Sequence, residues 1–151
     1  MTVRGACRLV AGVTALVAVL GCGRREAPEE RLDRLRLAHD LRPLGSTTVV
    51  RDGEPTLVVD LLVANQGAEA LPGLTVLVRL RGADGVEKVG RRVTLDLSGL
   101  RPGMAQQVST SLEGVTLGDR DEVTVELETR LPAEVLRSFP EYAAVAGSGG
   151  L

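Results

Sequence analysis

The feature that most constrains this chain is its division into short segments that alternate between apolar and polar residues. Residues 122–129 (EVTVELET) alternate without a fault, and residues 74–81 follow the same period of two. Such alternation is typical of a strand with one buried face. Residues 56–65 are apolar on both faces except at Asp60, as expected of a central strand. The positions expected to face the core are Leu74, Val76, Val78, Leu80, Val123, Val125 and Leu127.

Segments of this kind recur about every ten residues, which predicts an all-β fold of about seven antiparallel strands. Prolines fall between the segments, as expected because proline cannot donate to a strand ladder. Asp84-Gly85 predicts a hairpin, and Gly90 a bulge. A helix starting at Pro28 competes with the first strand, and one helical turn is expected at residues 133–138. The expected strands are residues 34–41, 47–51, 56–65, 74–81, 86–97, 105–112 and 122–129.

The N-terminal region has a different character. The first 21 residues contain no acid, Arg4 and Arg8 precede an apolar run at residues 9–20, and Thr14 is the only hydroxyl in that run. Twelve helical residues span ~18 Å, too short for a bilayer core of ~30 Å. A buried amphipathic helix is the alternative, but the run has no polar face. The pattern predicts a secretory signal peptide over residues 1–21.

Val19-Leu20-Gly21-Cys22, directly after this run, resembles the lipobox of bacterial lipoproteins. The resemblance implies that Cys22 receives a diacylglycerol and that the chain is cut between Gly21 and Cys22. It also implies acylation of the new amino group and, with Gly23 rather than Asp next, an outer-membrane location in a Gram-negative host. Each buried CH₂ contributes ~0.8 kcal/mol, so two or three acyl chains anchor stably. We therefore expect a lipid-anchored cell-envelope protein.

Cleavage at this position changes the charge and the cysteine content. The remaining 130 residues carry 16 basic and 20 acidic side chains, a net charge of −4. Cys7 leaves with the leader and Cys22 is alkylated, so no disulfide is expected; the alternative is a structural disulfide between them. Arg24 and Arg25 could lie near anionic headgroups, at ~1 kcal/mol each. Residues 22–33 are then a lipidated cysteine and a polar tether.

Two turn motifs carry a second resemblance. Asn65-Gln66-Gly67 follows one predicted strand and Leu100-Arg101-Pro102-Gly103 precedes another, which resembles bacterial immunoglobulin-like (CARDB-like) modules over residues 34–130. The resemblance implies an antiparallel immunoglobulin-like β-sandwich, and it carries over no functional residue. The domain is expected to span residues 34–142, followed by a flexible tail at 143–151.

One candidate interaction patch follows from the predicted hairpin. Centring it on Asp84-Gly85 places Arg81 opposite Lys88 and Leu77 opposite Arg92, so that four basic side chains share the outer face. Like charges in such a strip need water, acids or an anionic partner. The last predicted strand could supply the acids Glu122, Glu126 and Glu128; the alternative is a strip that faces a partner. The basic strip is Arg79, Arg81, Lys88 and Arg92.

The sequence contains no recognisable catalytic constellation. His39 is the only histidine, and Asp40 should turn to the opposite face of the same strand. Ser46 and Ser98 lack the setting of a catalytic nucleophile, so a half-buried structural histidine is expected. Residues 118–122 offer three carboxylates for Ca²⁺, but their spacing favours a solvated turn. We expect no enzyme, no cofactor and no metal.

The two aromatic residues, Phe139 and Tyr142, lie close together near the C-terminus, and tryptophan is absent. With a near-neutral charge, this argues against nucleic-acid binding. The pair is expected to cap one end of the sheets; the alternative is an exposed docking segment. The predicted function is a non-enzymatic module that binds a protein partner in the cell envelope through sheet faces or strand edges. The alternative is a carrier or sensor that holds a small apolar ligand between its sheets.

Overall fold

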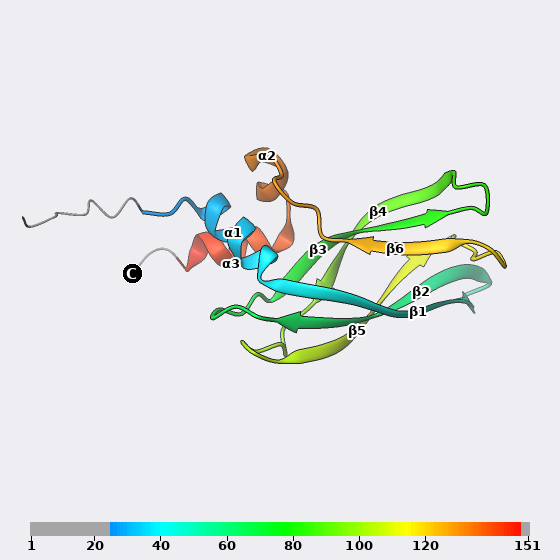
Figure 1. Cartoon of the computed structure of the whole chain (residues 1–151), viewed down its shortest axis with the longest axis horizontal. Helices are drawn as coiled ribbons and strands as arrows, with labels where there is room; N and C mark the ends of the chain where they lie inside the picture. The colour runs from blue at the N-terminus through cyan, green and yellow to red at the C-terminus, as the bar shows by residue number, and fades with distance from the viewer. Residues whose placement is uncertain (1–24, 149–151) are drawn as a thin grey trace, which may run out of the picture.

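The computed structural model describes residues 25–148, in which six strands form two antiparallel sheets of three strands each (Figure 1). The helices of this part of the chain gather at one end of the sheets. The elements are α1 (Pro28–Leu37), β1 (His39–Arg51), β2 (Glu54–Asn65), β3 (Gly73–Arg81), β4 (Glu87–Asp96), β5 (Ala105–Glu113), β6 (Glu122–Glu126), α2 (Ala133–Arg137) and α3 (Pro140–Gly147). The sheets have the orders β1-β2-β5 and β4-β3-β6. The predicted all-β class is confirmed.

The core is aliphatic and draws on both sheets and all three helices. The alternating positions of β3 predicted to face inward are all buried, and the predicted inward positions of the last strand, in and just after β6, pack against them. Burial of such side chains is the main stabilising term in folding. The two central strands and the helices contribute Leu57, Val59, Leu61, Val63, Leu74, Val76, Val78, Leu80, Leu32, Leu35, Leu136, Phe139 and Val145.

The prediction for the first strands was wrong. Residues 28–37 form a helix, where the end of a tether and the start of a strand were expected. The two strands expected at residues 34–41 and 47–51 are replaced by the single strand β1. The helix has Pro28 at its start, acids in its first turn and arginines in its last, an arrangement that complements the helix dipole. Leu32 and Leu35, at helical spacing, are buried. The chain therefore has six strands in its described part, not seven.

Two prolines lie inside strands rather than between them. Pro43 is in β1 and Pro55 is at the start of β2. Pro43 is tolerated because β1 is an edge strand. The register shifts between Pro43 and Gly45, which leaves Leu44 as the extra residue of a bulge.

The hairpin of β3 and β4 also contains a bulge, but not at Gly90 as predicted. Leu80 lies opposite Val89 and Arg81 lies opposite Glu87, so Lys88 is the extra residue. The turn between β1 and β2 is tighter, because Arg51 pairs directly with Glu54. There Asp52 and Gly53 have φ values of 52° and 83°, as a two-residue hairpin turn of this hand requires.

The predicted flexible tail is wrong over most of its length. Residues 140–147 form α3, in which Pro140 and Glu141 occupy the first turn and Val145 is buried. The helical turn expected at residues 133–138 is confirmed as α2. Within residues 25–148, no helix is long and apolar enough to cross a membrane.

Candidate functional site

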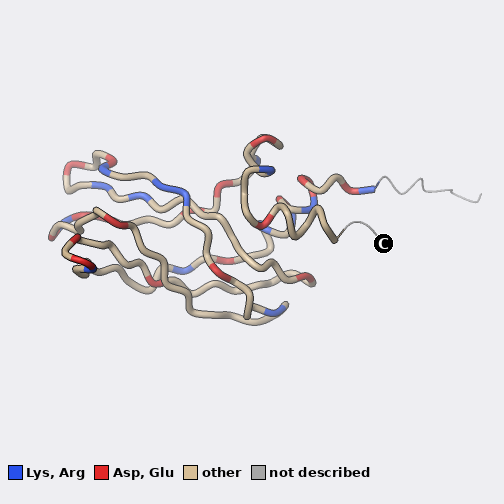
Figure 2. Tube along the Cα trace, turned by 180° about the vertical axis from the view of Figure 1, so that it is seen from behind, with Lys and Arg blue, Asp and Glu red and all other residues tan. Residues whose placement is uncertain are grey.

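The basic strip lies on the outer face of the β4-β3-β6 sheet, where Figure 2 shows basic positions following one another along two strands. Leu77 is opposite Arg92, as predicted, but Arg81 is opposite Glu87 rather than Lys88 because of the bulge. On its other side Arg81 is opposite Glu122, since β6 pairs with β3. The last strand therefore borders the strip, as the sequence predicted.

Three of the four basic residues of this strip form ion pairs with acidic side chains. Arg92 makes a two-pronged contact with Glu128, with Nε–Oε2 and Nη2–Oε1 distances of 2.6 and 2.9 Å. This hydrogen bonding from Arg92 lowers the pKa of Glu128. The other pairs are Arg79 with Glu87 at 2.8 Å and with Glu126 at 3.4 Å, and Lys88 with Asp121 at 2.7 Å. Most of the charge of the strip is thus neutralised within the chain. This favours the interpretation in which the chain's own acids balance the strip over the one in which the strip faces a partner.

One of the three acids of the turn at residues 118–122, Asp121, is paired with the same basic strip. Both oxygens of Asp121 accept hydrogen bonds from Lys88 Nζ, and Oδ2 also accepts the Gly118 N–H at 2.9 Å. These contacts lower the pKa of Asp121, the Lys88 hydrogen bond contributing most. Over residues 25–148, no group of three or more His, Cys, Asp or Glu side chains could hold a metal ion.

His39 lies at the start of β1 and is buried, more deeply than predicted. Its Nδ1–H donates to the carbonyl oxygen of Leu35 at 2.8 Å, while Nε2 is buried without a partner. Burial lowers the pKa of His39, so the ring is neutral. A neutral ring whose only hydrogen bond is to the backbone fits a structural role.

A buried pair of charges is the polar feature that the sequence did not reveal. Arg36 of α1 and Glu141 of α3 are 0% and 1% exposed, and Arg36 Nε lies 3.8 Å from Glu141 Oε1. Both meet at Thr75 of β3. Glu141 accepts the Thr75 N–H at 2.7 Å and its hydroxyl at 2.8 Å, and Arg36 Nη2 donates to the Thr75 carbonyl at 2.9 Å. Two helices are thus joined to one strand through a single residue.

Further contacts extend this cluster, which we call the Arg36–Glu141 cluster. The guanidinium carbon of Arg36 lies 4.7 Å above the centre of the Phe139 ring, a cation–π geometry. Thr94 Oγ1 is 2.9 Å from Thr75 Oγ1. Since Thr75 donates its proton to Glu141, Thr94 must donate to Thr75. Phe139 itself is buried, in agreement with the predicted capping role of the aromatic pair.

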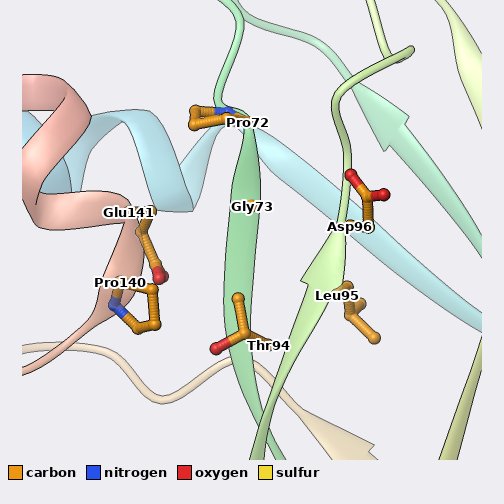
Figure 3. A pocket seen from close by; sticks show the side chains of 7 residues that line it. All are labelled: Pro72, Gly73, Thr94, Leu95, Asp96, Pro140 and Glu141. Carbon is orange, nitrogen blue, oxygen red and sulfur yellow. The ribbon is translucent and has the colours of Figure 1, made fainter.

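A hollow of about 330 Å³ opens beside this cluster (Figure 3). Pro140 and Glu141 come from α3, Thr94 and Asp96 come from β4, and Gly73 lies between them at the start of β3. A Cβ atom on Gly73 would approach Thr94 Cγ2 to 3.1 Å, so the glycine helps to keep this space open.

A second, polar hollow of about 490 Å³ lies beside the β1–β2 turn, lined by Arg51, Asp52, Glu54, Thr56 and Glu113. All five residues belong to the β1-β2-β5 sheet or its turn. Neither of these two hollows lies between the sheets.

Gly21 and Cys22, the expected cleavage and lipidation site, lie outside the described residues. The two turn motifs, in contrast, lie side by side. The Gly103 N–H donates to the Asn65 carbonyl at 2.8 Å, and the Asn65 N–H donates to the Met104 carbonyl at 2.9 Å.

Comparison with known proteins gives no family. No protein-family model matches the sequence, and no curated protein matches it. Among solved structures, the chain is similar to a β-glucosidase from Kluyveromyces marxianus in complex with glucose, at 21% identity and a TM-score of 0.31. The match covers 50% of this chain and 9% of the glucosidase.

Proposed function

We propose that this chain is a lipid-anchored protein of the bacterial cell envelope whose folded part is a non-enzymatic protein-interaction module. The observation that carries the proposal is the acid-free leader that ends in Val19-Leu20-Gly21-Cys22. Since the second residue of the mature chain is Gly23, the outer membrane is the proposed location in a Gram-negative host.

The position of the first helix fits an anchored domain. α1 begins at Pro28, six positions after Cys22. Six extended residues span at most ~20 Å, so the start of α1 would lie within that distance of the lipid. The first and last elements of the described chain, α1 and α3, both lie at the helical end of the molecule (Figure 1). We therefore propose that the domain is attached to the membrane through this end.

For the fold we propose an immunoglobulin-like β-sandwich. Two antiparallel sheets contribute to one aliphatic core, and the turn motifs that suggested the resemblance are hydrogen-bonded to each other. The resemblance to immunoglobulin-like modules implies this architecture and no functional residue.

The distribution of polar groups supports an interaction role over catalysis. The one histidine is bound to the backbone, Asp121 of the 118–122 turn is engaged by Lys88 and Gly118, and the basic strip is largely paired with acids. Strand edges remain as the surfaces through which a protein partner would bind. We propose no cofactor and no nucleic-acid partner. The alternative, a carrier for a small apolar ligand between the sheets, would need a pocket there, and no observation on the described residues favours it.

Mass spectrometry of the protein purified from bacterial membranes tests the anchor. We expect an N-terminal peptide that begins at Cys22 and carries a diacylglycerol, and incorporation of labelled palmitate into the intact protein. Cys22→Ser should abolish both, whereas Cys7→Ser, in the leader, should change neither. An unmodified Cys22 in the membrane-bound protein would contradict the proposal. Crosslinking on intact cells, followed by identification of the captured protein, tests the interaction role.

A further inference from the structure

The four edge strands of the two sheets differ in how well they are protected from pairing with another strand. An exposed edge offers unpaired N–H and C=O groups, and proteins commonly block it with charges, proline, bulges or short length. β1 contains Pro43 and a bulge, and β6 has only five residues, with an acid at each end. β4 contains a bulge and five charged residues, which are Glu87, Lys88, Arg91, Arg92 and Asp96.

β5 has none of these devices. Its nine residues, AQQVSTSLE, contain no proline and no charge before Glu113, and its pairing with β2 has no register shift. Ala105, Gln107, Ser109 and Ser111 are exposed. Outside its pairing with β2, the backbone of β5 accepts a side-chain hydrogen bond only at its last residue among the described residues, where Arg91 Nη1 of β4 donates to the Glu113 carbonyl at 3.2 Å. β4 of the other sheet thus approaches β5, but no described strand other than β2 pairs with it, so the other side of β5 is an unpaired edge.

We propose that β5 pairs with β5 of a second copy of this chain, antiparallel, so that the two β1-β2-β5 sheets form one continuous six-stranded sheet. The argument for a second copy is electrostatic and steric. With Ser109 on the two-fold axis, the two β5 strands overlap over their full length. Each residue then faces a residue of the second copy, in the pairs Gln107 with Ser111, Val108 with Thr110, and Gln106 with Leu112. The only charge, Glu113, faces Ala105. No like charges meet, although the mature chain as a whole is acidic.

Pairing of β5 with another edge of the second copy is less favourable. The other edges present a proline, a bulge or rows of charges, each of which interrupts a ladder or leaves charges facing uncharged partners. β5 against β5 is the one combination of described edges without a proline or a bulge, and its only charges are the two Glu113 side chains at the ends of the overlap.

This inference deepens the proposed function, on which it rests, because it names a second copy as the partner of the interaction module. It also has a geometric consequence. The two-fold axis is perpendicular to the strands, so the helical ends of the two copies lie at opposite ends of the joined sheet. Both lipid anchors reach one bilayer only if the strands lie along its surface. A tether of up to ~20 Å between Cys22 and Pro28 allows this.

The test is single-cysteine crosslinking of the full-length chain in bacterial membranes. Side chains directly opposite each other in an antiparallel pair have Cβ atoms ~4.5–5.5 Å apart, close to what a disulfide spans. Ser109→Cys should therefore give a disulfide-linked dimer. Gln107→Cys and Ser111→Cys lie on the same face of the same strand, but each is ~13 Å from its own copy at ~3.3 Å per residue. We expect at least five-fold less dimer from these two matched controls.

A pair of charge variants in the Ser109→Cys background tests the interface itself. Gln107→Lys with Ser111→Lys places lysines opposite lysines and should reduce the crosslinked dimer at least five-fold. Gln107→Glu with Ser111→Lys perturbs the same positions but places opposite charges together, so the dimer should persist. Equal losses in both variants would contradict the proposal.

The cysteine scan has clear outcomes. Dimer from only one of the three positions supports the antiparallel self-pair, with that residue on the axis. No dimer from any position, equal dimer from all three, or a crosslink to a different protein in place of a second copy overturns it. The unsubstituted chain separates this test from that of the proposed function. If the unsubstituted chain forms a disulfide dimer through Cys22, the proposal of a lipid on Cys22 is wrong. The cysteine scan of β5 is then repeated in a Cys22→Ser background, where its outcomes have the same meaning.

Discussion

The Arg36–Glu141 cluster makes a quantitative prediction about stability. Both side chains are fully buried, so removing one charge leaves the other in the interior without its ion-pair partner. Breaking a buried pair in this way costs ~3–5 kcal/mol, against a total of ~5–15 kcal/mol for a typical domain. Glu141→Gln keeps an oxygen that can accept the Thr75 N–H but removes the charge that faces Arg36. We therefore expect it to lower the free energy of unfolding by ~3 kcal/mol or more.

The converse variant, Arg36→Met, removes the guanidinium and leaves the Glu141 carboxylate buried without the charge that faces it. It should also lower the free energy of unfolding, by ~3 kcal/mol or more at neutral pH.

Urea denaturation followed by circular dichroism measures both effects. With a slope of ~2 kcal/mol per molar urea, a loss of 3 kcal/mol lowers the midpoint by ~1.5 M. The double variant Arg36→Met with Glu141→Gln should be more stable than the sum of the single losses predicts. A loss below ~1 kcal/mol in Glu141→Gln, or additivity of the two changes, would refute the argument that the charges depend on each other.

Three further predictions concern single residues. Burial holds the pKa of His39 below its ordinary value of 6.5, so as the pH falls the unfolded chain takes up a proton at this histidine before the folded chain does. The stability contributed by the neutral ring should therefore be fully present above pH ~6.5 and decrease below it. His39→Gln should remove this part of the pH dependence of the melting temperature. Arg92→Ala breaks an exposed pair with Glu128 and should cost less than ~1 kcal/mol in urea denaturation; a larger loss would show that the pair is more than a surface contact. Gly53→Ala places a side chain at φ 83° and should lower stability by ~1 kcal/mol or more, while Gly45→Ala, which has open space and no positive φ, should have little effect on the melting temperature.

Alternation along the chain was sufficient to predict β3 and its buried face, and a run that is apolar on both faces was sufficient to predict β2. In β2 and β3 the apolar side chains are numerous enough that only one register buries them, and the hairpin dipeptide then fixed Leu77 opposite Arg92. Loop prolines, in contrast, were a weaker guide, because an edge strand tolerates Pro43 on its free side. The bulge at Lys88 could not be located, since the sequence does not show which hairpin residue loses its partner.

The helices and the buried charges were missed for a different reason. Leu32, Leu35 and Leu37 fit both a helical and a strand period over so short a stretch, and the signal that decides is Pro28 followed by two acids. Pro140 followed by Glu141 gives the same signal for α3. Arg36 and Glu141, however, lie 105 positions apart in the sequence. Their burial depends on how α1 and α3 dock, which no local pattern records.

The docking of these helices limits how an anchored molecule could be built. Leu32, Leu35, Leu136, Phe139 and Val145 are each at most 5% exposed. At ~1.5–3 kcal/mol for each buried side chain, they contribute up to about 8–15 kcal/mol, which is comparable with the whole stability of a typical domain. No cysteine lies in residues 25–148, so no disulfide there could replace this packing. α1 therefore cannot unwind to lengthen a tether without loss of the fold. If Cys22 carries the lipid, as proposed, the six positions from Cys22 to Pro28 limit the tether to about 20 Å, and the sheets lie within that distance of the membrane plus the length of the domain itself.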